Sequence, residues 1–198
     1  GMANHHKNVF VGVGGADAIN KTHFVGAVCG MEQAMGRVDT PVRAIFQYMA
    51  GQFARELPIV YLLTVRGRGD SGQPVTRGIY AGNDDACLYR AASLARQVNV
   101  DLLDEPLERV VVYLDPAKYR SAWLGNKAIY RTRMALADGG DLIILAPGVA
   151  SFGEDAAIDR LIRKYGYHGS AHVLRMVREN ADLGENLSAA AHLIHGST

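Results

Sequence analysis

The chain has 198 residues with 48% hydrophobic content, two cysteines, and 21 Lys and Arg against 20 Asp and Glu. This length can bury a substantial core. The near-zero net charge excludes a protein that binds nucleic acid through a general basic excess. Two cysteines form no disulfide framework, so we expect a reducing compartment, the cytoplasm. No apolar run approaches the roughly 18 residues of a membrane span, so no membrane partner is expected.

Runs of apolar residues, bounded by glycine, proline and capping residues, predict the elements of the chain. In the first half we expect a strand at 9–13, a helix at 24–35, a helix beginning at Thr40-Pro41 and ending near 57, strands at 59–65 and 75–81, and a helix that is capped by residues 82–85 and ends near 98. In the second half we expect a strand at 109–114, a long helix at 117–137 that is ended by Gly139-Gly140, a strand at 141–146, and helices at 154–165, 170–180 and 186–195.

Strands that alternate with helices of this length favour an α/β fold. We therefore predict a mostly parallel sheet with helices on both faces, a Rossmann-like three-layer sandwich. The chain is expected to form a single α/β unit over 1–198, with a sub-boundary near 105–108. A strand-like run begins at Asn8 and the last helix ends near Gly196, so we expect a C-terminal fragment of a longer protein.

Two motifs are weak. Residues 12–17 resemble a dinucleotide-binding loop, but Asp17 would repel a pyrophosphate at a helix N-terminus. The hypothesis of a Rossmann oxidoreductase depends on this loop alone. His168 and His172 are separated by a predicted helix start, so they would not share a helical face. We assign no metal ligands from the sequence.

The stretch 118–133 carries five cations and no acid. On a helix, Trp123, Lys127 and Arg131 would form one row. Cations beside an indole and a phenol can hold a small carboxylate, although a solvated basic helix face is the alternative. The candidate substrate-binding residues are Trp123, Asn126, Lys127, Tyr130, Arg131 and Arg133.

Three segments carry a family resemblance: AWLGNKAIYRTRMALADGGDLIILAPGV, FGEDAAIDRLIRKYGYHG and NLSAAAHLIHGS. They resemble the lactate racemase family, in particular its uncharacterised homologues. The resemblance implies an isomerase of 2-hydroxy acids whose histidines act as acid and base. It also implies a nickel pincer nucleotide tethered to a lysine, and an additional α/β catalytic domain that precedes this portion.

The family's residues are matched here only in part. A catalytic histidine falls on His5 or His6, and His6 is our catalytic candidate. Asp17 stands at the tethering lysine, with Lys21 out of register, and residues 31–33 lack the nickel-binding histidine, for which His23 comes too early. We therefore assign no cofactor-binding residue.

The substrate-binding segment of the family is also only partly matched. Its tyrosine corresponds to Tyr130, whereas Arg131 replaces a glutamine and Met134 stands at a lysine position. Arg133 or Lys127 would have to supply that cation.

We therefore expect part of a racemase or epimerase for a 2-hydroxy acid or a sugar acid, with this fragment supplying carboxylate-binding residues. The alternative is a noncatalytic small-carboxylate-binding module of a homologue that has lost the nickel-pincer site. The expected partners are a small carboxylate and the missing N-terminal domain of the same protein, with no nucleic acid and no membrane. The sequence assigns no oligomeric state.

Overall fold

A computed structural model of the chain describes residues 5–197. It divides into two compact units. Unit 1 comprises Gly1–Ile19 and Gln33–Leu102, and unit 2 comprises Asn20–Glu32 and Leu103–Thr198. No sequence signal assigned residues 20–32 to the same unit as the C-terminal half.

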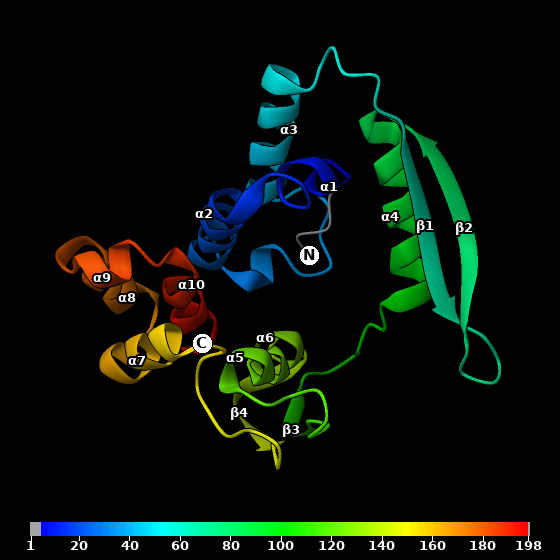
Figure 1. Ribbon diagram of the computed structural model, residues 1–198. Helices are drawn as coiled ribbons and strands as arrows, with labels where there is room; N and C mark the ends of the chain where they lie inside the picture. The colour runs from blue at the N-terminus through cyan, green and yellow to red at the C-terminus, as the bar shows by residue number, and fades with distance from the viewer. Residues whose placement is uncertain (1–4, 198) are drawn as a thin grey trace. The chain divides into compact units, whose positions relative to one another are not determined.

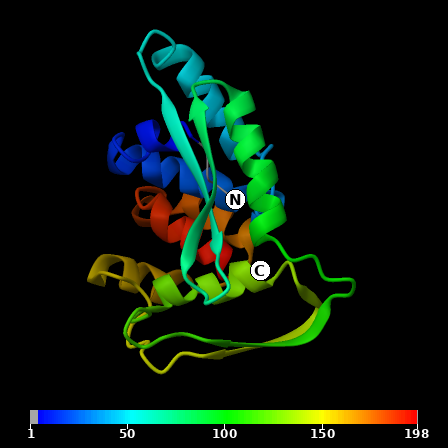
Figure 2. The same ribbon diagram turned by 90° about the vertical axis from the view of Figure 1, so that its right-hand side faces the viewer.

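Unit 1 contains a β-hairpin covered by one helix. The strands β1 and β2 pair antiparallel from Tyr61↔Gly82 to Arg68↔Pro74, and α4 packs along the hairpin (Figures 1 and 2). A Cβ at Gly67 would lie 2.5 Å from Val98 of α4, so glycine permits this close approach. The elements of this part of the chain are α1 (Lys7–Phe10), α2 (Gly15–Val28, which crosses the unit boundary), α3 (Pro41–Phe53), β1 (Tyr61–Arg68), β2 (Pro74–Gly82) and α4 (Asp85–Asn99).

The long helices of unit 1 begin at capped residues. The Thr40 hydroxyl accepts a hydrogen bond from the backbone N–H of Arg43, and Pro41 occupies the first helical position of α3. Asp84 Oδ1 accepts from the N–H of Cys87 at the start of α4. These starts confirm the helix beginnings that the sequence predicted.

Unit 2 combines a parallel strand pair with a group of helices. The strands β3 and β4 run parallel, with register from Arg109↔Asp141 to Tyr113↔Leu145 after an irregularity next to Leu107. A 3₁₀ turn, η1 (Met31–Gln33), lies at the unit boundary. The remaining elements are β3 (Leu107–Tyr113), α5 (Ala122–Gly125), α6 (Lys127–Thr132), β4 (Leu136–Leu145), α7 (Ala156–Tyr165), α8 (Ser170–Glu179), α9 (Ala181–Gly184) and α10 (Leu187–His195).

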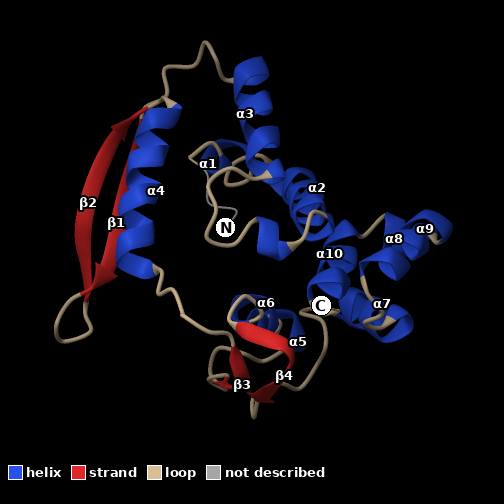
Figure 3. Cartoon of the chain, turned by 180° about the vertical axis from the view of Figure 1, so that it is seen from behind, coloured by secondary structure: helices blue, strands red, loops and turns tan. Residues whose placement is uncertain are grey.

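The core of unit 2 lies among α7, α8, α9 and α10, which gather in one group (Figure 3). Leu183 and Leu193 are fully buried there. Six consecutive residues of α10 are buried, and the small side chains Ala189, Ala190 and Ala191 let neighbouring helices approach closely. α10 is therefore a central helix rather than a surface helix.

Three predictions of elements are wrong. The helix expected at 24–35 begins earlier, at Gly15, and ends at Val28 as α2, since Gly30 has a φ of +87° and breaks it. The predicted strand 9–13 is replaced by the short helix α1 and turns, in which Val13 donates a backbone hydrogen bond to Val9. The predicted helix 117–137 is interrupted at Asn126, and β4 already begins at Leu136.

The glycine pair Gly139-Gly140, which the sequence places at the end of that helix, lies inside β4. Gly139 has φ +78°, and a Cβ at Gly140 would lie 2.9 Å from the carbonyl oxygen of Glu108. Gly139 therefore supplies a left-handed backbone at the irregularity in the β3–β4 ladder, and Gly140 permits the close approach of the neighbouring strand, with which a side chain would clash.

The α/β class is confirmed, but the structure does not show a clear mostly parallel sandwich. Within residues 5–197 the strands form one antiparallel pair and one parallel pair. The segment after β1 turns back at Gly69, whose N–H donates to the carbonyl of Gln73, so β1 pairs with its neighbour as a hairpin. None of the helices in the described part of the chain combines the length and hydropathy of a membrane span.

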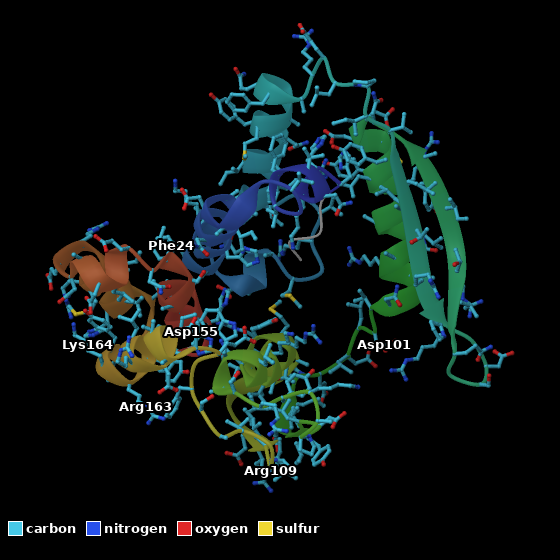
Figure 4. The ribbon with its side chains drawn as sticks, viewed as in Figure 1. Phe24, Asp101, Arg109, Asp155, Arg163 and Lys164 are labelled. Carbon is cyan, nitrogen blue, oxygen red and sulfur yellow. The ribbon has the colours of Figure 1, made fainter. Side chains whose placement is uncertain are left out.

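The N-cap of α7 gives a first prediction. Asp155 begins this helix (Figure 4), and its Oδ1 accepts from the N–H groups of Ala157 and Ile158 at 2.8 Å each. Asp155→Ala should lower the free energy of unfolding by about 1 kcal/mol, because two helical N–H groups lose their acceptor. Urea denaturation followed by circular dichroism measures this. Asp155→Asn keeps an acceptor and should lose less, so equal losses for both variants would contradict the capping role.

Candidate functional site

Two adjacent histidines form a cluster in unit 1. His5 is buried, with 2% of its surface exposed, and its ring centroid lies 3.9 Å from that of His6. Both imidazole rings make T-shaped contacts with the ring of Tyr61 on β1. His6 Nδ1 also lies 3.1 Å from the Tyr61 hydroxyl. β1 thus positions a phenol against the residues that precede α1.

A carboxylate completes this cluster. Asp85, in the first turn of α4, accepts hydrogen bonds from Arg43 Nη2 at 2.7 Å and from Gln47 Nε2 at 2.6 Å, so α3 orients it. Ligand atoms of His5, His6 and Asp85 all lie within 4.8 Å of one another. Among the described residues this is the group that could hold a metal ion.

Burial keeps the two imidazoles neutral. It lowers the pKa of His5 to about 4; His6 and Arg43 act in the same direction, against Asp85. Burial also lowers the pKa of His6, again opposed by Asp85. Neither ring nitrogen of His5 has a hydrogen-bond partner within residues 5–197. A neutral buried imidazole can accept a proton or ligate a metal ion.

A cavity of about 810 Å³ lies beside this cluster within unit 1, and His5 forms part of its wall. Its other walls are largely aliphatic side chains of β1 and α4, and three cations line it: Lys7, Arg37 and Arg96. No Asp or Glu is among its lining residues. In the described part of the chain, none of these three side chains forms a hydrogen bond or an ion pair. The cavity therefore combines largely aliphatic walls with three positively charged side chains.

The predicted substrate-binding residues all lie in unit 2, and two of them are packed into its interior. Trp123 stacks on His192, with ring centroids 4.8 Å apart. Asn126 is buried, and its Nδ2 lies 3.4 Å from both His192 Nδ1 and the His192 carbonyl. Tyr167 Oη lies 2.8 Å from His192 Nε2 on the other side of the ring. These contacts give Trp123 and Asn126 a packing role.

Of the other four predicted residues, Tyr130 and Arg133 lie near His195, whereas Lys127 and Arg131 do not line the same cavity. The ring of Tyr130 lies 5.7 Å from that of His195, and Arg133 pairs with Glu32 at 3.4 Å. Arg133 and His195 line a small cavity of about 120 Å³. Lys127 is half-buried and Arg131 is exposed on α6, away from the lining of that cavity.

Sequence reasoning missed most of the unit 1 site. The doublet His5-His6 was visible, but Tyr61, Arg43 and Asp85 carry no local signal, because they are far apart in the chain. The cavity cations are equally scattered. The basic stretch 118–133 was conspicuous only because its cations are contiguous.

The residues present do not fit the nickel pincer nucleotide that the resemblance implies. Asp17, an exposed residue in the first turn of α2, stands where the tethering lysine is expected, and a carboxylate cannot form that bond. The turn Met31–Gln33 holds no histidine to bind nickel. We therefore derive no chemistry from this cofactor.

The comparisons with known proteins bear on the fold alone. No protein-family model matches the chain, and no curated protein matches it. A crystal structure of a protein from Thermotoga maritima, solved by the Northeast Structural Genomics Consortium, matches with a TM-score of 0.70 and 24% sequence identity. The match covers 90% of this chain and 43% of the Thermotoga chain. The chain is thus similar in fold to less than half of that larger protein.

The buried histidines of α10 predict a pH-dependent stability. Burial, the first cause for each residue, lowers the pKa of both His192 and His195 to about 4, whereas an unfolded histidine titrates near 6.5. The unfolded state therefore binds more protons between these values. The stabilisation is complete above pH 6.5 and is lost as the pH falls toward 4, by on the order of 3 kcal/mol per histidine.

Urea denaturation between pH 7.5 and 4.5 measures this loss. The variant His195→Gln should show a shallower decline, since one titrating group is removed. An equal slope in the wild type and in His195→Gln would show that His195 does not contribute.

Proposed function

We propose that the chain binds a small organic acid in the cavity of unit 1, as part of a lactate-racemase-like isomerase acting on a 2-hydroxy acid or a sugar acid. One observation carries the proposal: three cations and no acid line a cavity whose walls are aliphatic. Cations neutralise and orient a carboxylate, and apolar walls accommodate the carbon chain of the acid and exclude water.

The histidine cluster supplies the acid–base chemistry that such a reaction needs. Inversion at the carbon that bears a hydroxyl requires a base that takes up and returns the hydroxyl proton, together with an acceptor that takes and returns the hydride of that carbon. The histidines account for the base alone, and the hydride acceptor would have to come from outside the described residues. His6, the candidate from the sequence, is close to His5, which lines the cavity, and is oriented by the Tyr61 hydroxyl. Its lowered pKa keeps it in the proton-accepting form at neutral pH.

A noncatalytic carboxylate-binding module is the second candidate. Asp17 at the expected tether position favours it, since a homologue without the tether lacks the hydride acceptor of the family. In this case the cavity would bind the same ligands, and no turnover would follow.

The remaining sequence predictions also stay proposals for the larger protein. The face of β3–β4 that carries the opposed pairs Val111↔Ile143 and Tyr113↔Leu145 is exposed and apolar, whereas parallel sheets are normally covered on both faces. Further elements on this face would complete a three-layer sandwich.

We propose a cytoplasmic location, a further N-terminal domain of the same protein as a partner, and no nucleic-acid or membrane partner.

Calorimetric titration with D- and L-lactate, glycerate and gluconate tests the binding step. Arg37→Ala and Arg96→Ala should each weaken binding by about tenfold, because each removes a charge-assisted hydrogen bond to the carboxylate. Lys127→Ala and Arg131→Ala are the matched controls from unit 2 and should leave binding unchanged. Loss of binding in these controls alone would instead place the site on α6.

Turnover separates the two candidates. The complete natural protein is incubated with one enantiomer of each acid that binds, and the other enantiomer is measured by chiral chromatography. Inversion that is lost in His6→Gln, with binding retained, supports the isomerase. Binding without inversion of any acid supports the noncatalytic module.

A further inference from the structure

We propose that His5, His6 and Asp85 form a binding site for one divalent transition-metal ion at the wall of the unit 1 cavity. The three side chains come from two places in the sequence, the residues before α1 and the first turn of α4, and their ligand atoms lie within 4.8 Å of one another. In a tetrahedral zinc site, ligand atoms at about 2.1 Å from the ion are roughly 3.4 Å apart. Small rotations of the side chains therefore suffice to close the site.

The unsatisfied ring of His5 is the second, independent observation. This side chain is 98% buried, and neither Nδ1 nor Nε2 has a hydrogen-bond partner within the described residues. A buried imidazole without a partner loses its hydration and gains nothing in return. A metal ion would provide the missing interaction, because neutral imidazole nitrogen is a common metal ligand.

The surroundings of the other two ligands resemble the outer shell of metal sites. His6 Nδ1 faces the Tyr61 hydroxyl at 3.1 Å, which would fix the orientation of the ring. Asp85 is held by Arg43 and Gln47, one on each carboxylate oxygen. Metal-ligating histidines and carboxylates are typically oriented by such partners through their remaining polar atoms.

The ligand set suggests the type of ion and the type of site. Two imidazoles and one carboxylate suit Zn²⁺ and its neighbours better than Ca²⁺ or Mg²⁺, which prefer oxygen ligands throughout. Three protein ligands leave a position for water or substrate, which is the arrangement of catalytic rather than structural zinc sites. The positive charge of Arg43 opposes a cation, but its ion pair with Asp85 offsets this charge.

The inference goes beyond the proposed function and can be tested without any organic acid. A 2-hydroxy acid in the cavity could chelate the ion through its hydroxyl and carboxylate oxygens, so binding of the acid and binding of the ion can coexist. The acid–base role of His6 cannot coexist with metal binding, because His6 cannot be both a ligand through its lone pair and a free proton acceptor. Metal binding therefore decides which role His6 takes.

Calorimetric titration of Zn²⁺ into the 198-residue chain, after treatment with a chelator, tests the site. We expect one ion per chain, binding weakened at least tenfold by His5→Ala and by Asp85→Asn, and a weakening of about tenfold in Tyr61→Phe. The matched control is His172→Ala. His168 and His172 also bring their rings within 5.0 Å, yet no described carboxylate joins them in a three-ligand group. This variant should change the affinity less than twofold.

The visible absorption spectrum of bound Co²⁺ gives a second readout. An absorption band should appear when Co²⁺ is added to the wild type and should disappear when Zn²⁺ displaces it. The band should be absent in His5→Ala. Asp85→Asn removes the charge that pairs with the buried Arg43, so its fold is checked by circular dichroism. His6→Gln replaces a half-buried side chain at the start of α1 and carries the test if Asp85→Asn does not fold. The proposal is overturned if the wild type binds no ion, or if His5→Ala and His6→Gln bind it with wild-type affinity. Either result leaves binding of the organic acid to be judged by its own titration.

Discussion

The ion pair between Arg43 and Asp85 holds the site of unit 1 together. Arg43 is 3% exposed, and removal of its partner would leave an uncompensated charge in the interior. The pair joins the first turn of α3 to the first turn of α4, and the guanidinium also lies 4.6 Å from the centre of the Tyr89 ring. Because Asp85 is fixed in this way, a carboxylate stands beside the two histidines that precede α1.

Unit 2 also buries a polar side chain, but there the side chain and its partners are neutral. His192 is buried in α10, where the Trp123 ring covers its face and Asn126 and Tyr167 reach its two nitrogens. Burial lowers the pKa of this histidine to about 4, so the ring stays neutral and its polar atoms keep neutral partners. The most conspicuous residues of the basic stretch are therefore part of a core, whereas the candidate ligand chemistry lies in the other unit.

Local sequence signals predicted the elements better than their assembly. The starts of α3 and α4 were predictable, since a capping side chain and its N–H partner are three residues apart. Gly139 and Gly140 are typical of the end of a helix, but they lie in β4, where Gly139 has a positive φ and Gly140 lies so close to the neighbouring strand that a side chain would clash. The run 9–13 had strand-forming residues, yet local hydrogen bonds of α1 replaced the strand pairing that such a run would need.

The sequence by itself determined the α/β class, the starts of α3 and α4, and the choice of His6, beside His5, as a candidate functional residue. Only the tertiary structure decided what those histidines contact. Tyr61 is 55 residues from His6 and Asp85 is 42 residues from Arg43, so no spacing rule links them. The same holds for the cavity, whose three cations are scattered along unit 1. Local hydrogen bonds and side-chain periodicity act over a few residues, whereas a site is assembled by packing between elements that are distant in the chain.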